Sequence, residues 1–252
     1  MKIWQVKTCF EIGLSRKITV NKLLERRLLS VEFSQHTLEN QKLLGYFVLS
    51  IFLNSLGNGL TVAINLGSAL WTAASVNLNH AFAVSLSLMM FLPAFLVIIV
   101  NSLILGKLSP KRIIGNLVFL TPFSLLVGYF SAGLSQLGIN HLNLLVRTGL
   151  DCLGVVLIAV AISLYQRVNW MLHPVDDLMQ IIRFKYFKGN ATIAQLVVFM
   201  PPVIAIIVAV LVSHRIYAVN VGTIFALLFQ GSLVGLADKY LFPSLKHQNL
   251  DK

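Results

Sequence analysis

The sequence predicts an all-α polytopic membrane protein with about six transmembrane helices, and three observations lead to that prediction. Hydrophobic residues make up 57% of the 252 residues and charged residues only 12%, which is about half the charged fraction of a typical soluble domain. The mean hydropathy of the chain is +0.81. The apolar residues are gathered in runs that are long enough for a helix to cross a bilayer. We therefore expect the lipid bilayer to be a partner of the whole chain.

Six apolar runs approach the roughly 20 residues that a transmembrane helix needs. The polar stretch Asn54-Ser-Leu-Gly-Asn-Gly59 is expected to interrupt the first run and expose backbone carbonyls, or else its glycines only permit close helix packing. Prolines occur inside the second, third and fifth runs. The six runs extend over about 43–66, 81–105, 113–130, 144–165, 193–212 and 219–236.

The distribution of Lys and Arg predicts the orientation of these helices. If both ends of the chain lie on one side of the membrane, eighteen of the twenty Lys and Arg residues fall on that side. The outside loops would be 67–80, 131–143 and 213–218, which contain Arg215 alone. Cytoplasmic segments are enriched in Lys and Arg, so we predict a multi-pass protein of the cell (inner) membrane with cytoplasmic termini. The net charge of +11 comes from basic residues that lie mostly between the apolar runs and at the two ends of the chain. This pattern is typical of membrane orientation, so nucleic acid is not an expected partner.

Composition divides the chain into three parts. Residues 1–42 form a basic cytoplasmic extension, which is predicted either as an amphipathic helix on anionic lipid or as a loosely ordered segment. Residues 43–240 form the transmembrane domain, and residues 241–252 form a cytoplasmic tail. The first residues lack the apolar core of a signal peptide, so we expect no cleaved leader.

The transmembrane domain is predicted to contain two similar halves, residues 43–135 and 142–240. Each half begins with an apolar helix, continues into a short polar stretch that contains Trp, and ends with two helices joined by a short basic linker. Because three helices are an odd number, the second half must enter the membrane from the opposite side. Inverted repeats of this kind are common in secondary transporters, whose sites lie near the midplane at interrupted helices.

Three sequence blocks resemble those of a known family. They are Asn65-Leu-Gly-Ser-Ala-Leu-Trp-Thr72, His173-Pro-Val-Asp-Asp-Leu-Met179 and Val219-Asn-Val-Gly-Thr223. At these blocks the chain resembles the YczE/YitT group of bacterial membrane proteins, over roughly residues 43–240. Six positions match its pattern: Gly67, Trp71, Pro174, Asp176, Leu178 and Met179. Four positions depart from it: Leu70 and Thr72 replace a proline and an aspartate, and His173 and Val175 replace a glycine and an arginine. The resemblance implies the predicted fold and a permease with a sugar-type substrate.

The block around Pro174 contains the leading candidate ligands. Asp176 and Asp177 are adjacent, so on a helix they project about 100° apart and cannot form a paired catalytic site. Asp176 would lie in the first turn of a helix that starts near Pro174. There its carboxylate would cap free N–H groups, bind a cation, a proton or a sugar hydroxyl, or do both.

Other candidate site residues lie within the predicted helices. Asn54 and Asn58 share a helix face and are predicted to be polar lining. Arg147 and Asp151 have the i, i+4 spacing of an ion pair, and they would lie either in a transport path or at the outer interface. Trp71 is a candidate ligand contact or an interfacial anchor. Interhelical hydrogen bonds are expected from Gln195, Thr223 and Gln230.

Function is predicted from these residues and from the motifs that do not occur. The chain contains no P-loop, no His-Glu-x-x-His and no Gly-x-Ser-x-Gly, and Cys9 and Cys152 form neither a disulfide framework nor a zinc site. We therefore expect no enzyme activity, metal or cofactor. The predicted function is a small-solute permease or ion-coupled transporter that binds a small polar solute with a coupling cation or proton. The alternative is a non-transporting accessory or regulatory protein that acts through residues 1–42. Homo-oligomerisation is left open.

Overall fold

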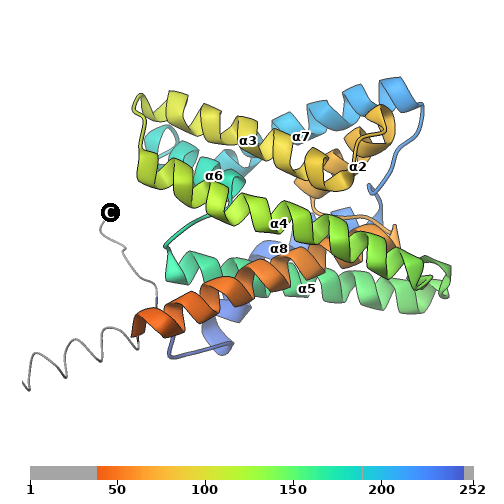
Figure 1. Cartoon of the computed structure of the whole chain (residues 1–252), viewed down its shortest axis with the longest axis horizontal. Coiled ribbons are helices and arrows are strands. Elements are labelled where there is room, and N and C mark those ends of the chain that lie inside the picture. Colours follow the sequence, from red (N-terminus) through yellow and green to blue (C-terminus); the bar gives the residue numbers. More distant parts are fainter. Residues whose placement is uncertain (1–38, 189, 247–252) are drawn as a thin grey trace, which may run out of the picture. The chain divides into compact units, whose positions relative to one another are not determined.

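The computed structural model describes residues 39–188 and 190–246, and these residues are helical without any strand (Figure 1). Residues 1–45 and 46–252 form two separate units. The described part of the first unit, residues 39–45, is the start of a helix. The rest of the predicted extension 1–42 lies outside the described residues, as do residues 247–252 of the predicted tail. The helices are the first helix Glu39–Ile64, α2 Leu70–Phe82, α3 Leu86–Leu105, α4 Pro110–Gln136, α5 Leu144–Val168, α6 Pro174–Lys185, α7 Ala191–Ser213 and α8 Val221–Tyr240, with a short 3-10 helix at Ile139–His141.

Six of the described helices are long and apolar enough to span a membrane, which confirms the predicted all-α class and the number of spans. They are the first helix and α3, α4, α5, α7 and α8. Many of their large apolar side chains are exposed, for example Leu196, Leu211 and Leu228, as expected for helices that face lipid. The chain is therefore a multi-pass helical membrane protein.

Two shorter helices, α2 and α6, complete the architecture. The segment 67–80 was predicted as an outside loop; this prediction is wrong, because most of it forms α2. The start of α6 at Pro174 agrees with the prediction, since proline is favoured in the first turn of a helix. Both halves therefore contain a long helix, a short helix and two long helices in the same order. The inverted relation between the halves stays a prediction.

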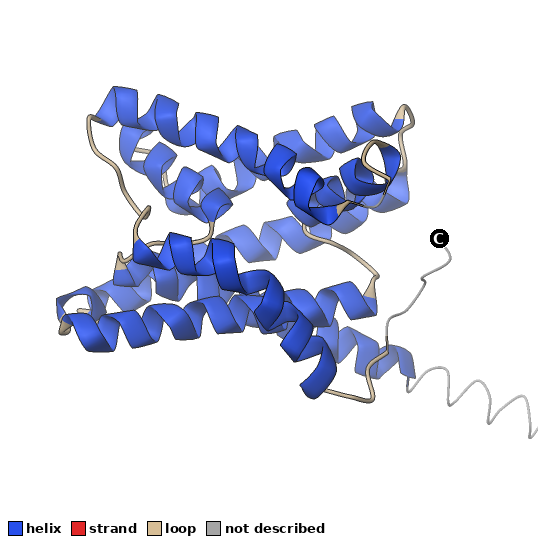
Figure 2. Ribbon diagram, turned by 180° about the vertical axis from the view of Figure 1, so that it is seen from behind, coloured by secondary structure: helices blue, strands red, loops and turns tan. Residues whose placement is uncertain are grey.

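The short helices are exchanged between the halves. Helix α2 packs mainly on α7 of the second half, and α6 packs on α3 of the first half. Helices α2, α3, α6 and α7 form one group (the α2/α3/α6/α7 group), which lies together in Figures 1 and 2. The first helix, α5 and α8 form a second group, in which α5 packs on α8. Helix α4 contacts both groups, since it packs on α3 and also on the first helix.

The first helix is continuous through Asn54–Gly59, so the prediction of an interrupted helix is wrong. The alternative, close packing, explains the glycines. A Cβ added to Gly57 would lie 2.6 Å from the carbonyl oxygen of Gly154, and one added to Gly59 would lie 2.6 Å from Cβ of Phe130. Small residues allow helix backbones to approach this closely in membranes.

Backbone hydrogen bonds join the segment after the first helix to the start of α8. Ser68 N–H donates to Ala218 O over 3.1 Å, and Gly222 N–H donates to Leu66 O over 3.0 Å. Gly67 adopts a φ of +127°, and a Cβ there would clash with the backbone of Thr223. Glycine is therefore required where the two halves meet.

Candidate functional site

A cavity of about 320 Å³ lies between the α2/α3/α6/α7 group and the second group. This volume is at the lower end of the range of small-molecule sites. Most lining residues come from the middle of the long helices, such as Asn54 of the first helix, Phe123 of α4 and Ile158 of α5. The first turns of both short helices complete the lining. The polar lining residues are Asn54, Asn58, Thr72, Ser75, Tyr165, Gln166, His173, Asp176, Gln195 and Gln230.

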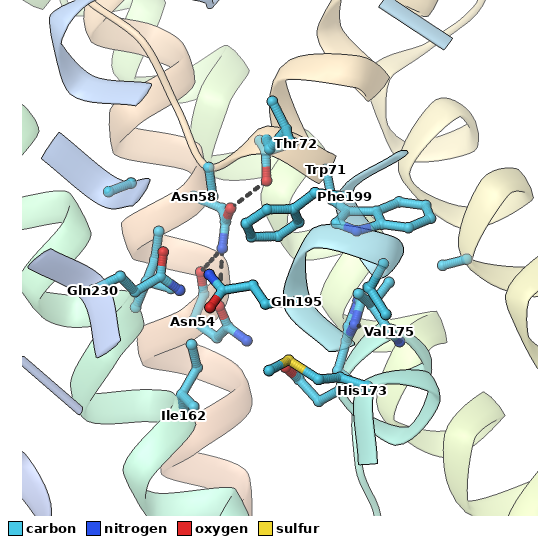
Figure 3. A pocket seen from close by; sticks show the side chains of 18 of the residues that line it. Asn54, Asn58, Trp71, Thr72, Ile162, His173, Val175, Gln195, Phe199 and Gln230 are labelled. Atoms are coloured by element: carbon cyan, nitrogen blue, oxygen red, sulfur yellow. Dashed lines mark hydrogen bonds between the residues drawn. The ribbon is translucent and has the colours of Figure 1, made fainter. Parts of the chain in front are cut away.

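Asn54 and Asn58 of the first helix both line the cavity (Figure 3). The amide nitrogen of Asn58 donates to the backbone and side-chain oxygens of Asn54, both over 2.9 Å. The hydroxyl of Thr72 donates to Oδ1 of Asn58 over 2.5 Å, which ties the start of α2 to the first helix. Asn58 is thus held in one orientation, whereas Nδ2 of Asn54 donates no hydrogen bond within the described chain.

Gln195 of α7 and Gln230 of α8 also line the cavity, and Figure 3 shows their amides close to those of Asn54 and Asn58. The sequence predicted interhelical hydrogen bonds for both glutamines. Within the described residues neither makes one. The hydroxyl of Thr223 donates to Ala218 O and accepts from Ser68 N–H, and both of these partners lie in the segments between helices rather than in a helix. The two glutamine amides are therefore available to a ligand.

Asp176 lies in the first turn of α6 and borders the cavity. The phenol of Tyr165 on α5 donates a hydrogen bond to its carboxylate. The N-cap of α6 is made by His173, whose Nδ1 accepts from Val175 N–H over 3.3 Å, so capping does not explain Asp176. Burial raises the pKa of Asp176, although the Tyr165 hydrogen bond acts in the opposite sense.

Asp177 points away from the cavity toward α3 and α4. It is only 1% exposed, and its Oδ1 lies 3.2 Å from Nε of Arg112. Its Oδ2 accepts from the amides of Asn116, over 3.0 Å, and Asn101, over 3.5 Å. Asn101 also donates to Pro174 O over 3.1 Å. Asp177 therefore fixes α6 to α3 and α4, and it is not among the residues that line the cavity.

The predicted ion pair between Arg147 and Asp151 does not form in the described structure. Arg147 donates instead to the carbonyl oxygen of Ile64, over 2.7 and 3.3 Å, at the end of the first helix. The last carbonyls of a helix lack intrahelical partners, and an arginine can satisfy them. Asp151 is buried against Gly222 at the start of α8. Neither residue lines the cavity.

Trp71 lines the cavity and packs against a buried cluster that includes Leu178 and Val198. Its indole Nε1 is buried without a hydrogen-bond partner in the part of the chain that is described. Trp71 is partly buried with its indole nitrogen enclosed by the protein, and its role as an interfacial anchor stays a prediction.

The sequence did not single out several residues of the site or of its support. Thr72, Tyr165 and His173 line the cavity. Thr72 and His173 were named only as departures within the quoted sequence blocks, and Tyr165 lies outside these blocks. Arg167, predicted as part of a cytoplasmic segment, is 2% exposed in the last turn of α5. It pairs with Asp238 over 3.4 Å and donates to the carbonyl of Leu241 over 2.9 Å, which holds the end of α8 against α5.

The fold and the cavity define a class, a helical multi-pass membrane protein with a cavity between two groups of helices. No group of three or more His, Cys, Asp or Glu residues among the described residues could hold a metal ion. The chain belongs to the family of unknown function DUF6198, whose sequence pattern it matches over residues 41–239. No curated protein and no solved structure matches it.

Proposed function

We propose that this protein is a small-solute permease or ion-coupled secondary transporter of the bacterial cell membrane. The observation that supports the proposal most directly is the cavity between two helix groups, where the segments 54–72 and 170–183 meet at Asp176. Many of its lining residues, such as Asn54, Phe123 and Ile158, belong to helices long enough to span a membrane. A site at this depth, formed by the first turns of short helices, is typical of secondary transporters.

The arrangement of the helices supports alternating access. A cavity between two groups can open to either side if one group rocks against the other. The repeated order of elements and the exchange of α2 and α6 are consistent with two inverted halves. We propose this symmetry together with cytoplasmic termini, as the distribution of Lys and Arg favours.

We also propose that the chain is of the YczE/YitT type. Of the matching positions, Trp71, Asp176 and Met179 line the cavity, and Gly67 packs where the halves meet. All four departures from that pattern, Leu70, Thr72, His173 and Val175, line the same cavity. Changes gathered at one site are expected when a site is adapted to a different ligand, so the sugar-type substrate is not carried over.

A thermal-stability screen of the detergent-purified protein tests the proposed function. Sugars, amino acids, nucleosides, vitamins, metal ions and anionic lipids would be added to wild type, to Asp176→Asn and to a variant that lacks residues 1–38. A ligand at 100 times its dissociation constant adds about 2.7 kcal/mol if it binds only the folded state. We expect a soluble compound to stabilise wild type and the truncated variant but not Asp176→Asn. Stabilisation by anionic lipids alone, lost on truncation, would instead favour an accessory protein that acts through its N-terminal extension.

A further inference from the structure

The first turns of α2 and α6 both line the cavity, and they differ in charge. The third residue of α6 is Asp176, whereas the third residue of α2 is Thr72. A helix N-terminus carries a partial positive charge. In α6 this charge is compensated by Asp176 and Asp177 and by the cap from His173. In α2 the first turn contains no acidic residue.

The start of α2 is also uncapped. Its N-cap is Ala69, which has no side-chain acceptor. The backbone N–H groups of Leu70, Trp71 and Thr72 have no partner within the described residues. Free N–H groups at a helix start are well suited to an anionic or carbonyl oxygen. Because these residues line the cavity, a ligand can supply that oxygen.

A second feature of the same wall also calls for an acceptor on the ligand. Asn54 is 5% exposed and lines the cavity, and its Nδ2 has no acceptor among the described residues. Its Oδ1 is already used by Asn58. Figure 3 shows Asn54 on the cavity wall beside Gln195 and near Asn58, to which Thr72 of α2 is bonded. This nitrogen is not fully enclosed by the protein, so a ligand or water in the cavity can accept its hydrogen bond.

The ionisable residues of the cavity limit the net charge of the ligand. Tyr165, His173 and Asp176 line the cavity, and none of the described lining residues is Lys or Arg. A net anion would meet the carboxylate of Asp176 without a cationic side chain to neutralise it. A group that carries positive charge would be favoured beside Asp176, and an acceptor group beside the first turn of α2.

We propose that the cavity binds a small zwitterion, with its cationic group at Asp176 and its carboxylate at the first turn of α2. This proposal rests on the proposed function and names its substrate class. The apolar walls contributed by Phe123, Phe199 and Leu227 would contact the uncharged part of the ligand. The cavity size restricts that part to a compact side chain.

The test compares matched compounds on the purified full-length protein. The probes are the standard amino acids and glycine betaine, followed for each stabilising amino acid by its carboxamide and by the analogue that lacks the amino group. We expect a zwitterion to raise the melting temperature, and we expect the carboxamide and the deaminated acid to bind at least about tenfold more weakly, since each loses one charge-assisted contact.

Two substitutions locate the two ends of the ligand. Asp176→Asn should weaken zwitterion binding about tenfold or more. Thr72→Asp places a carboxylate at the first turn of α2, where it suits the helix but repels the ligand carboxylate. The Thr72→Asp variant should therefore no longer bind the zwitterion. The Thr72→Ser variant keeps the hydroxyl that is bonded to Asn58, and it should bind the zwitterion like wild type. The melting temperature without ligand shows whether each variant is folded.

Each result decides between the inference and the broader function. Zwitterion binding that is lost in Thr72→Asp and kept in Thr72→Ser supports the inference. Stabilisation by neutral sugars or nucleosides but by no zwitterion, still dependent on Asp176, would overturn the inference and leave the permease function standing. If no soluble compound of either panel stabilised the wild-type protein, both proposals would be overturned.

Discussion

Asp176 and Asp177 are neighbours in the sequence with different surroundings, and this difference determines what each can do. Asp176 faces the cavity and Tyr165, whereas Asp177 is enclosed by Arg112, Asn116 and Asn101. The helical spacing of two adjacent residues explains why they point to different partners.

We predict that Asp177→Asn destabilises the protein by about 1–3 kcal/mol, because it removes charge-assisted contacts to buried amides. The contribution of Arg112 is small, since that side chain is 41% exposed and its ion pair is screened by solvent. Asp176→Asn should change stability less, since the Asp176 carboxylate has one hydrogen-bond donor, Tyr165, whereas Asp177 is contacted by two amides and Arg112. Thermal unfolding in detergent measures both. Equal losses of stability in the two variants would contradict the different roles.

Stability should also depend on pH through His173, the N-cap of α6. Burial lowers the pKa of His173 below its ordinary value of 6.5. Between the lowered pKa and pH 6.5, His173 therefore binds a proton in the unfolded chain but not in the folded protein. The contribution of His173 to the free energy of unfolding is therefore complete above pH 6.5 and decreases as the pH falls toward the lowered pKa.

A pH series of melting temperatures in the Asp176→Asn background measures this effect. That background is needed because the pKa of Asp176 is raised, so its ionisation lowers stability as the pH rises. His173→Asn keeps a residue that caps helices well and removes the titration. We expect the melting temperature of the His173→Asn variant to depend less on pH below pH 6.5 than that of the protein that keeps His173. An equally steep fall in both proteins would show that another group is responsible.

At the scale of helices, the contact between the first helix and α5 depends on glycine. A Cβ at Gly154 would lie 2.6 Å from the methyl group of Thr61, whereas a Cβ at Gly149, on the same helix, would have no neighbour within 4 Å. We predict that Gly154→Ala costs about 1–3 kcal/mol through overpacking. Gly149→Ala should be neutral or stabilising, because alanine is the better helix former. Denaturation of the two variants side by side tests this, and equal stability would contradict the close contact.

The long helices could be predicted from sequence because they depend on local hydropathy. All six were expected, and the start of α6 was expected from Pro174. Helix α2 was missed because its residues 70–82 mix polar and apolar side chains, and its main packing partner, α7, lies more than 100 residues later in the chain. The continuous first helix was missed because the packing partners of Gly57 and Gly59 are on α5 and α4.

The candidate site was predictable only in part for the same reason. Asn54, Asn58, Trp71 and Asp176 were singled out as polar or aromatic residues in apolar surroundings, and the fold brings them to one cavity. Arg147 and Asp151 were paired by helical spacing alone. The end of the first helix, which offers Arg147 the carbonyl of Ile64, could not be placed from sequence.

At the scale of the whole molecule, the proposed function requires that the cavity open to both sides of the membrane. Hydrogen bonds from Thr72 to Asn58 and from Tyr165 to Asp176 join the two helix groups that line it. Small relative movement of packed helix groups is a common way to change access to a site.

The measurement that tests this requirement most directly is the reactivity of one cysteine in the cavity. Gln230→Cys would be introduced in a Cys9→Ser, Cys152→Ser background and exposed to a membrane-impermeant thiol reagent in right-side-out and inverted vesicles. Leu228→Cys is the matched control, because this residue is on the same helix, is 66% exposed and does not line the cavity. We predict that Cys at position 230 reacts from both sides, with protection by the stabilising solute, and that Cys at position 228 reacts from neither. Reaction of position 230 from one side only would contradict a transporter and favour a receptor or accessory role.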